Sequence, residues 1–228
     1  MSKFRIRFSF KIILITILIW ISSNIVGGIN MSSLKGSILF TDGGGWIYLA
    51  NINNVQNTIR EFFRGYIGNH LLGWDPYFSS NCSYIIFAKD NPMGWPLSES
   101  PKYEIMIVDR EVKNFKKVID MGKTPCGYPS WSPDGTKIAF LARDQLYNPV
   151  GEGGQGELFT CSVDGSNLRK ITEIQIFPSR PSWMPDSKKI VFASKDGKIY
   201  GINYDGAGLK EIVRGFAPSV SPDGKKIA

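Results

Sequence analysis

Three stretches of this chain repeat one another almost residue for residue, and this self-similarity constrains the fold more than any other feature. PSWSPDGTKIAF covers residues 129–140, PSWMPDSKKIVF covers residues 181–192, and PSVSPDGKKIA covers residues 218–228. A further copy, PYFSSNCSYIIF, covers residues 76–87, and a shortened copy, LKGSILF, ends at Phe40. Repetition over tens of residues is typical of architectures that use one structural unit many times.

A second shared block follows each copy of the motif. ELFTCSVDGSNLRKIT at residues 157–172 aligns with KIYGINYDGAGLKEIV at residues 198–213, and EIMIVDREVKNFKKVI and WIYLANINNVQNTIREF align more loosely. The Ser-Pro-Asp-Gly step predicts a tight turn, because proline fixes φ at the second turn position and glycine closes the turn. The Asp-Gly steps predict hairpins between strands. We therefore expect each unit to be a four-stranded antiparallel meander.

Strands such as KIAFLA and KIVFAS are apolar on both faces, which a sheet requires when both of its sides are covered. Such sheets repeated about an axis form a β-propeller. The sequence thus predicts an all-β fold, a β-propeller over residues 35–228 with four blades and the start of a fifth. The expected blades cover residues 35–65, 76–122, 129–173 and 181–214, with a partial blade at 218–228.

The Trp-Ser-Pro-Asp-Gly-x-Lys-Ile-Ala-Phe signature resembles the propeller repeat of the TolB family. The resemblance covers residues 35–228 and implies a six-bladed ring, of which this sequence would hold four blades and part of a fifth. TolB itself is similar in being exported, but it places an α/β domain before the propeller, so the chain does not resemble TolB proper. The repeat positions expected to have structural roles are Trp131, Pro133, Asp134, Gly135, Trp183, Pro185, Asp186, Pro222, Asp223 and Gly224.

The first 28 residues have the layout of a secretory signal peptide. Basic residues precede an apolar run from Ile12 to Ile21, and small residues follow it. The alternative is an uncleaved membrane anchor over residues 12–26, although the run falls short of the roughly 20 residues that cross a bilayer. Both interpretations predict export, to the periplasm or to the cell exterior.

The charge balance does not indicate a nucleic-acid partner. The net charge is +7, but four of the 27 basic residues precede residue 12. The rest of the chain is close to neutral, whereas nucleic-acid binding needs clustered Lys and Arg. A hydrophobic share of 43% over 228 residues predicts one substantial core instead.

Antiparallel connectivity places the tight turns on one face of the propeller and the long segments on the other. The long segments are the loops at 89–102 and 143–156 and the link at 64–75. Long loops on a rigid scaffold are where binding usually resides. We expect a protein partner or a small ligand on this long-loop face; the alternative is that the loop aromatics only pin their own loops to the propeller. The expected contacts are Trp95, Tyr147, His70, Trp74 and Asp144.

Two sets of repeat residues invite functional interpretations that their positions argue against. Trp131 and Trp183 could form a stacking pair, yet both occupy one repeat position on an inner strand, which favours packing between blades. Asp134, Asp186 and Asp223 could ligate a metal, yet each recurs in a turn one blade from the next. We expect these aspartates to cap their own turns.

Other motifs also favour structural roles. GEGGQG at residues 151–156 has dinucleotide-binding spacing, but a strand rather than a helix is predicted after it. Cys82, Cys126 and Cys161 lack metal or redox spacing and are expected to be buried small hydrophobes. The single histidine and the lack of a Gly-x-Ser-x-Gly elbow argue against catalysis. No metal or cofactor is expected.

These observations predict an exported, non-catalytic β-propeller that serves as a protein-binding or scaffold module at the cell envelope. The same repeat is known in propellers fused to serine peptidases of the prolyl-oligopeptidase type and in tricorn-like proteases. The alternative is therefore that the chain is the N-terminal propeller portion of such a peptidase, with its catalytic domain missing from this sequence.

Overall fold

The computed structural model describes residues 37–41, 46–51, 60–64, 76–91, 102–110, 113–142 and 156–228. The regular elements in these ranges are β-strands that form one three-stranded and three four-stranded antiparallel sheets. Sheet 1 holds β1 (Ser37–Thr41), β2 (Trp46–Asn51) and β3 (Arg60–Arg64); sheet 2 holds β4 (Tyr77–Phe78), β5 (Tyr84–Asn91), β6 (Lys102–Asp109) and β7 (Phe115–Asp120); sheet 3 holds β8 (Cys126–Trp131), β9 (Lys137–Ala142), β10 (Glu157–Ser162) and β11 (Arg169–Lys170); sheet 4 holds β12 (Ser182–Trp183), β13 (Lys189–Ala193), β14 (Lys198–Asn203) and β15 (Lys210–Arg214).

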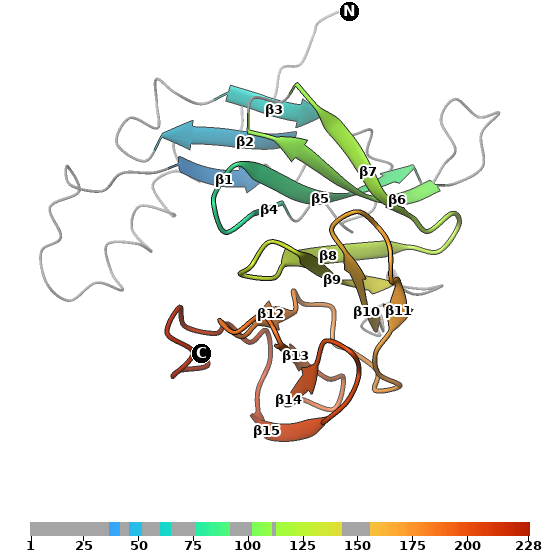
Figure 1. Cartoon of the computed structure of the whole chain (residues 1–228), viewed down its shortest axis with the longest axis vertical. Coiled ribbons are helices and arrows are strands. Elements are labelled where there is room, and N and C mark those ends of the chain that lie inside the picture. The colour runs from blue at the N-terminus through green and yellow to red at the C-terminus, as the bar shows by residue number, and fades with distance from the viewer. Residues whose placement is uncertain are drawn as a thin grey trace, which may run out of the picture.

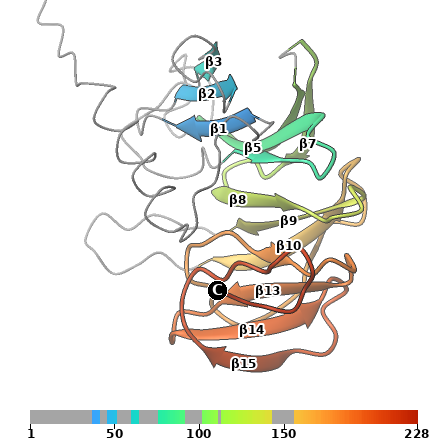
Figure 2. The ribbon, with the colours of Figure 1, turned by 90° about the vertical axis from the view of Figure 1, so that its left-hand side faces the viewer.

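Each sheet is a meander whose strands pair in chain order. The sheets follow one another through the molecule, from β1–β3 to β15, as Figure 1 shows and Figure 2 repeats from the side. After sheet 4, residues 219–228 begin a further unit, the fifth hairpin, in which Val220 bridges to Ile227. The predicted all-β propeller of four-stranded antiparallel blades is confirmed.

The strand register follows the internal repeat. In every sheet, the last aromatic residue of the motif lies opposite an apolar or aromatic residue of the next strand. The four cross-strand pairs are Phe40 with Tyr48, Phe87 with Met106, Phe140 with Phe159, and Phe192 with Tyr200. In sheets 3 and 4 the paired rings stack, with centroids 5.7 and 5.9 Å apart. One repeated sequence pattern therefore produces one repeated pairing.

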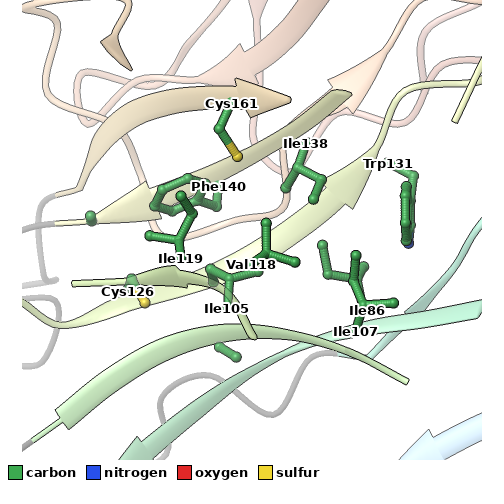
Figure 3. Close-up of a cluster of buried hydrophobic side chains, with 12 residues drawn as sticks. Ile86, Ile105, Ile107, Val118, Ile119, Cys126, Trp131, Ile138, Phe140 and Cys161 are labelled. Carbon is green, nitrogen blue, oxygen red and sulfur yellow. The ribbon is translucent and has the colours of Figure 1, made fainter. Parts of the chain in front are cut away.

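The hydrophobic core lies between the sheets, in two layers on either side of sheet 3. Alternate residues of β9 divide between the layers: Ile138 and Phe140 face sheet 2, and Ala139 and Leu141 face sheet 4. Figure 3 shows the first layer, where Ile86, Ile105 and Ile107 of sheet 2 meet sheet 3. Because both faces of sheet 3 are covered, its strands are apolar on both faces, as the sequence predicts.

The last strands are the most exposed strands of sheets 3 and 4. Every residue of β11 and β15 is exposed, whereas β8 is buried along nearly its whole length. In sheet 2 the first strand, β4, is itself partly exposed, because Tyr77 is exposed and Phe78 is half-buried. The first strands contribute to the site described below.

The third blade is expected to begin at residue 129, but its first strand, β8, already begins at Cys126. Cys126 pairs with Ala142, and a register shift between Gly127 and Ser130 absorbs the extra residues. Tyr128, inside the shift, has φ of 54°. Such a β-bulge lets the strand continue past Pro129, where a motif-based boundary would start it.

No helix among the described residues is long and apolar enough to cross a membrane. The predicted leader, residues 1–28, lies outside the described residues.

Candidate functional site

The turns between first and second strands fix where each first strand ends. In sheet 3 the Gly135 amide donates to the Ser132 carbonyl at 2.9 Å, which closes a four-residue turn around Pro133 and Asp134. Gly135 has φ of +73°, a left-handed conformation that favours glycine. The equivalent residues of the other copies are Cys82, Ser187 and Gly224, with φ of 55°, 57° and 70°.

The preceding side chain caps each of these turns; it is an aspartate in three copies and Asn81 in the fourth. Asp134 accepts hydrogen bonds from the Ser132 hydroxyl at 2.6 Å and from the Thr136 amide at 2.9 Å. Burial raises the pKa of Asp134, but hydrogen bonds from Ser132, Thr136 and Lys137 outweigh burial and hold the pKa below its ordinary value. Asp186 and Asp223 likewise accept from the backbone amides of Lys188 and Lys225. Among the described residues, no group of three or more His, Cys, Asp or Glu could hold a metal ion.

Neighbouring sheets are joined through the same turns. The Asp134 amide donates to the hydroxyl of Ser187, which lies in the corresponding turn of sheet 4, at 2.9 Å. The fifth hairpin is attached in a similar way, because the Val220 amide donates to the Ser182 hydroxyl at 3.0 Å. These bonds hold the first strands of successive sheets side by side.

The first strands of sheets 2, 3 and 4 and the start of the fifth hairpin enclose a groove of about 610 Å³. This volume lies within the range of about 300–1,000 Å³ that is usual for ligand sites. Aromatic rings, prolines and serines make up most of the described lining, in which Arg180 is the one charged residue. The lining residues are Tyr77, Phe78, Ser80, Ser130, Trp131, Ser132, Pro133, Arg180, Pro181, Ser182, Trp183, Pro185, Ala217, Pro218, Ser219, Val220, Ser221 and Pro222.

Two tryptophans at the same repeat position form part of the groove wall. Trp131 is 6% exposed and packs between sheets 2 and 3, and Trp183 is 7% exposed and packs between sheets 3 and 4. The Trp183 indole donates to the Ser130 carbonyl of the preceding sheet at 3.4 Å. The buried indole nitrogen of Trp131 has no hydrogen-bond partner. Leaving a buried donor unsatisfied costs about 1–3 kcal/mol.

Arg180 spans the groove from sheet 4 to sheet 2. Its guanidinium carbon lies 4.6 Å from the centre of the Tyr77 ring, and its Nη2 atom donates to the Pro76 carbonyl at 3.4 Å. Sheet 3 lies between the two sheets in chain order, so this contact requires the first strands of sheets 2 and 4 to converge. We infer that the sheets fan out from the groove toward their exposed last strands.

The five predicted loop contacts, Trp95, Tyr147, His70, Trp74 and Asp144, lie outside the described residues. In the sequence, Trp74 stands two residues before Pro76.

The repeat motif does not indicate the groove, because Tyr77 stands where other copies have serine and Arg180 lies just before its copy of the motif. The prolines beside them, Pro76 and Pro181, open two copies of the motif and were the available signal.

The three cysteines differ in exposure. Cys82 is exposed, so the prediction that it is a buried small hydrophobe is wrong: it occupies the glycine position of an exposed turn. Cys126 and Cys161 are buried in the layer between sheets 2 and 3, and the three cysteines form no disulfide with one another. Burial raises the pKa of Cys161 to about 12, with a smaller contribution from Asp164, so this thiol is not a nucleophile at neutral pH.

The segment after GEGGQG is a strand, as predicted. Gly156 bridges to Ile176 at the edge of sheet 3, and β10 follows directly. A dinucleotide site of this kind requires a helix at that point, with its N-terminus at the pyrophosphate. The structure of these residues therefore does not fit that use of the glycines.

The chain is similar in sequence to known proteins. No family model matches the chain. Over 168 residues, 71% of this chain and 35% of the relative, the chain is 28% identical to the Tol-Pal system protein TolB of Francisella tularensis subsp. tularensis (strain FSC 198). A stretch of 63 residues, 28% of this chain and 8% of the relative, is 38% identical to the uncharacterized peptidase YuxL of Bacillus subtilis (strain 168).

Among solved structures, TolB from Acinetobacter baumannii matches with a TM-score of 0.60 at 16% identity. The match covers 84% of this chain and 45% of that one. The chain spans about a third of the length of the curated TolB relatives it matches. The chain therefore has a TolB-like β-propeller fold.

Proposed function

We propose that the protein is an exported, non-catalytic β-propeller that binds a protein partner at the cell envelope. The observation that carries the proposal is the groove, in which aromatic rings and prolines from four successive units surround one hollow. Aromatic side chains supply much of the binding energy at protein interfaces. The similarity to a Tol-Pal system protein supports a partner that is itself a protein.

The long-loop face extends this binding surface in the proposal. In this proposal, antiparallel connectivity puts the long segments predicted at 89–102 and 143–156 at the end of the sheets where the first strands begin, the end of Tyr77. Trp95, Tyr147, His70, Trp74 and Asp144 would then contact the partner around the mouth of the groove. The domain arrangement in this proposal is a leader over residues 1–28, either cleaved or retained as an anchor, followed by the propeller. The chain would differ from TolB proper in having no domain between them.

Site-specific photo-crosslinking in the producing bacterium tests the proposal. A photoreactive residue at Trp95 or Tyr147 is expected to give one discrete adduct with an envelope protein. The same residue at Lys210, which is exposed on the outer strand β15, is the control and should give none. Equal adducts at all three positions would contradict the proposal. A photoreactive residue at Tyr77 gives a second test: its adduct should weaken in a variant that combines Trp95→Ala and Tyr147→Ala, and an undiminished adduct would also contradict the proposal.

A second candidate is the propeller portion of a serine peptidase, of the prolyl-oligopeptidase or tricorn-like type. The stretch that is 38% identical to a peptidase favours it. In such an enzyme the nucleophile lies on another domain and the propeller controls access to it. Expression of the gene with all its downstream codons, followed by assay of aminoacyl-nitroanilide hydrolysis, separates the two candidates.

A further inference from the structure

The fourth strand of sheet 2 has a bulge that places two consecutive apolar residues on one face. Ile105 of β6 pairs with Ile119 of β7, but the next residue of β6 pairs with Lys117, so Val118 has no partner residue. A bulge interrupts the alternation of side chains along a strand. Val118 and Ile119 are accordingly both buried in the layer between sheets 2 and 3.

Sheet 4 has the same bulge at the same place, but its two residues are exposed. Val213 pairs with Ile199, and Ile212 before it has no partner residue. The Cδ1 atom of Ile212 lies 3.3 Å from the position where a Cβ atom on Gly201 would stand, so both bulge residues lie on the face of Ile199 and Gly201. Ile202 packs against sheet 3, so this face points away from sheet 3. Ile212 and Val213 are 45% and 51% exposed.

The bulge residues belong to an apolar stretch along an open sheet edge. Leu209 and Phe216 are also exposed, so four of the eight exposed large hydrophobic residues in the described chain lie between residues 209 and 216. Among the described strands, β15 pairs only with β14, and Figure 2 shows β15 as the outermost strand of its sheet. An open edge with exposed apolar side chains is a template for pairing with another strand.

Residues 209–216, LKEIVRGF, are complementary to themselves when two copies run antiparallel. If Ile212 lies opposite Val213 of a second copy, Glu211 lies opposite Arg214 of that copy. The leucine that begins the stretch then lies opposite the phenylalanine that ends it. A two-fold axis repeats each of these pairs, so apolar residues meet apolar residues and the acidic residue meets a basic one.

The faces of β15 agree with this register. Glu211 pairs with Tyr200 and Arg214 pairs with Lys198, so both charged residues lie on the face of β14 opposite to Ile199. The charged pairs between copies would therefore lie on one face of the joined sheet, and the apolar pairs would lie on the other.

Neighbouring registers are less favourable. A shift of one residue in one direction places Lys210 opposite Arg214 of the second copy, and like charges directly opposite each other are destabilising. A shift of one residue in the other direction places Ile212 opposite Arg214. The complementarity thus selects a second copy of the chain in one register.

We propose that two copies of this chain associate by antiparallel pairing of β15, with Glu211 of each copy opposite Arg214 of the other. Within the chain, Oε2 of Glu211 accepts a hydrogen bond from Lys198 at 2.8 Å, and a carboxylate has acceptor sites for a further donor. Charged residues usually protect an edge strand from pairing. In this register the opposite charge of the second copy matches them. The inference goes beyond the proposed function and does not depend on it.

Sedimentation velocity of the purified chain over a concentration series tests the inference, and a monomer–dimer equilibrium is expected. Glu211→Arg and Arg214→Glu each place like charges opposite each other twice in the dimer, so each should weaken dimerisation by roughly 10-fold or more. Lys116→Glu makes the same change of charge as Arg214→Glu on the outer strand β7 and should dimerise as the parent does.

A mixture of the two β15 variants tests the register itself. In a dimer with one copy of each, the introduced arginine lies opposite the introduced glutamate, and the native Arg214 lies opposite the native Glu211. The mixture should therefore dimerise as tightly as the parent, although neither variant does so alone. Val213→Lys, which leaves the charged pairs in place, should also weaken dimerisation. Thermal unfolding verifies that each variant folds.

Pairing through β15 also affects other measurements on this strand. A photoreactive residue at Lys210 would give a self-adduct, which has twice the mass of the chain and contains only its peptides. Mass spectrometry distinguishes that product from an adduct with another protein. Dilution with unlabelled chain removes the distances between copies from spin-label measurements on β15.

A chain that stays monomeric at millimolar concentration would overturn the inference. Folded Glu211→Arg and Arg214→Glu variants that dimerise as tightly as the parent would overturn it as well, because another surface would then hold the copies together. A mixture of these two variants that dimerises no better than either variant alone would show that Glu211 and Arg214 do not meet between copies, which also contradicts the inference.

Discussion

At the scale of single residues, two glycines with positive φ have different reasons to be glycine. Gly135 has φ of +73° and nothing within 4 Å of the position where a Cβ atom would stand. Gly165 has φ of +90°, and its Cβ atom would lie 2.2 Å from the carbonyl oxygen of Val118 in the preceding sheet. The first position needs glycine for backbone conformation alone, and the second also needs it for close approach between sheets.

The two positions therefore predict unequal costs for the same substitution. Gly135→Ala should lower the free energy of unfolding by about 1–2 kcal/mol, the cost of a left-handed conformation for an L-residue. Gly165→Ala should cost roughly 1–3 kcal/mol more, because the hairpin must move away from β7. Urea unfolding followed by fluorescence measures both; equal losses would show that sheets 2 and 3 do not approach as closely as described.

The residues at the fourth position of this turn show what the motif predicts and what it does not. Cys82 and Ser187 stand where Gly135 and Gly224 stand in other copies, and all four have positive φ. The turn was predictable because its hydrogen bonds are local. The exposure of Cys82 was not, because the packing around a turn depends on neighbours that are distant in sequence.

At the scale of elements, an ionised aspartate stabilises the first turn of sheet 3. The pKa of Asp134 is lowered in the folded chain, since the hydrogen bonds it accepts outweigh the opposing effect of burial. A carboxyl group with a lowered folded pKa binds protons more readily when unfolded. Its contribution to stability is therefore complete above its unfolded pKa of about 3.9 and is lost as the pH falls toward the folded value.

Asp134→Asn should accordingly change the pH dependence of stability. At pH 7 the variant should be less stable than the parent, by up to about 1 kcal/mol because the group is partly solvent-screened. As the pH falls below about 4, the difference between the two proteins should narrow progressively. Urea midpoints measured from pH 2 to pH 7 provide the comparison, with Asp196→Asn as the control in another exposed turn. A difference that persists undiminished at pH 2 would mean that the carboxylate charge is not what stabilises the turn.

Strand identities and pairing were predictable because they depend on local alternation and on turn residues. The alignment of residues 157–172 with residues 198–213 makes Phe159 equivalent to Tyr200. In the structure, each of the two lies opposite the last aromatic residue of the motif in its own sheet. The start of β8 was not predictable, because the bulge between Gly127 and Ser130 interrupts the motif-based pattern.

At the scale of the whole molecule, the contact between Arg180 and Tyr77 is the most informative feature. It joins sheets that are not neighbours in chain order, so the first strands converge while the last strands lie apart. The sequence predicted a propeller from repetition and from apolar patterns on both faces of the strands. It did not indicate the groove, because convergence depends on the angle between sheets, which no single repeat encodes.

A pair of distances measured by pulsed electron paramagnetic resonance tests this convergence most directly. Spin labels on Cys82 and Lys188→Cys report on the inner turns of sheets 2 and 4. Labels on Lys116→Cys and Lys210→Cys, with Cys82→Ser, report on their outer strands. The labelled positions are exposed, and Cys126 and Cys161 are buried away from the reagent. If the sheets fan out around the groove, the distance between the labels on the outer strands must be clearly longer than the distance between the labels on the inner turns. Sheets stacked in parallel about 10 Å apart would give about 20 Å for both pairs, and that equality would contradict the account.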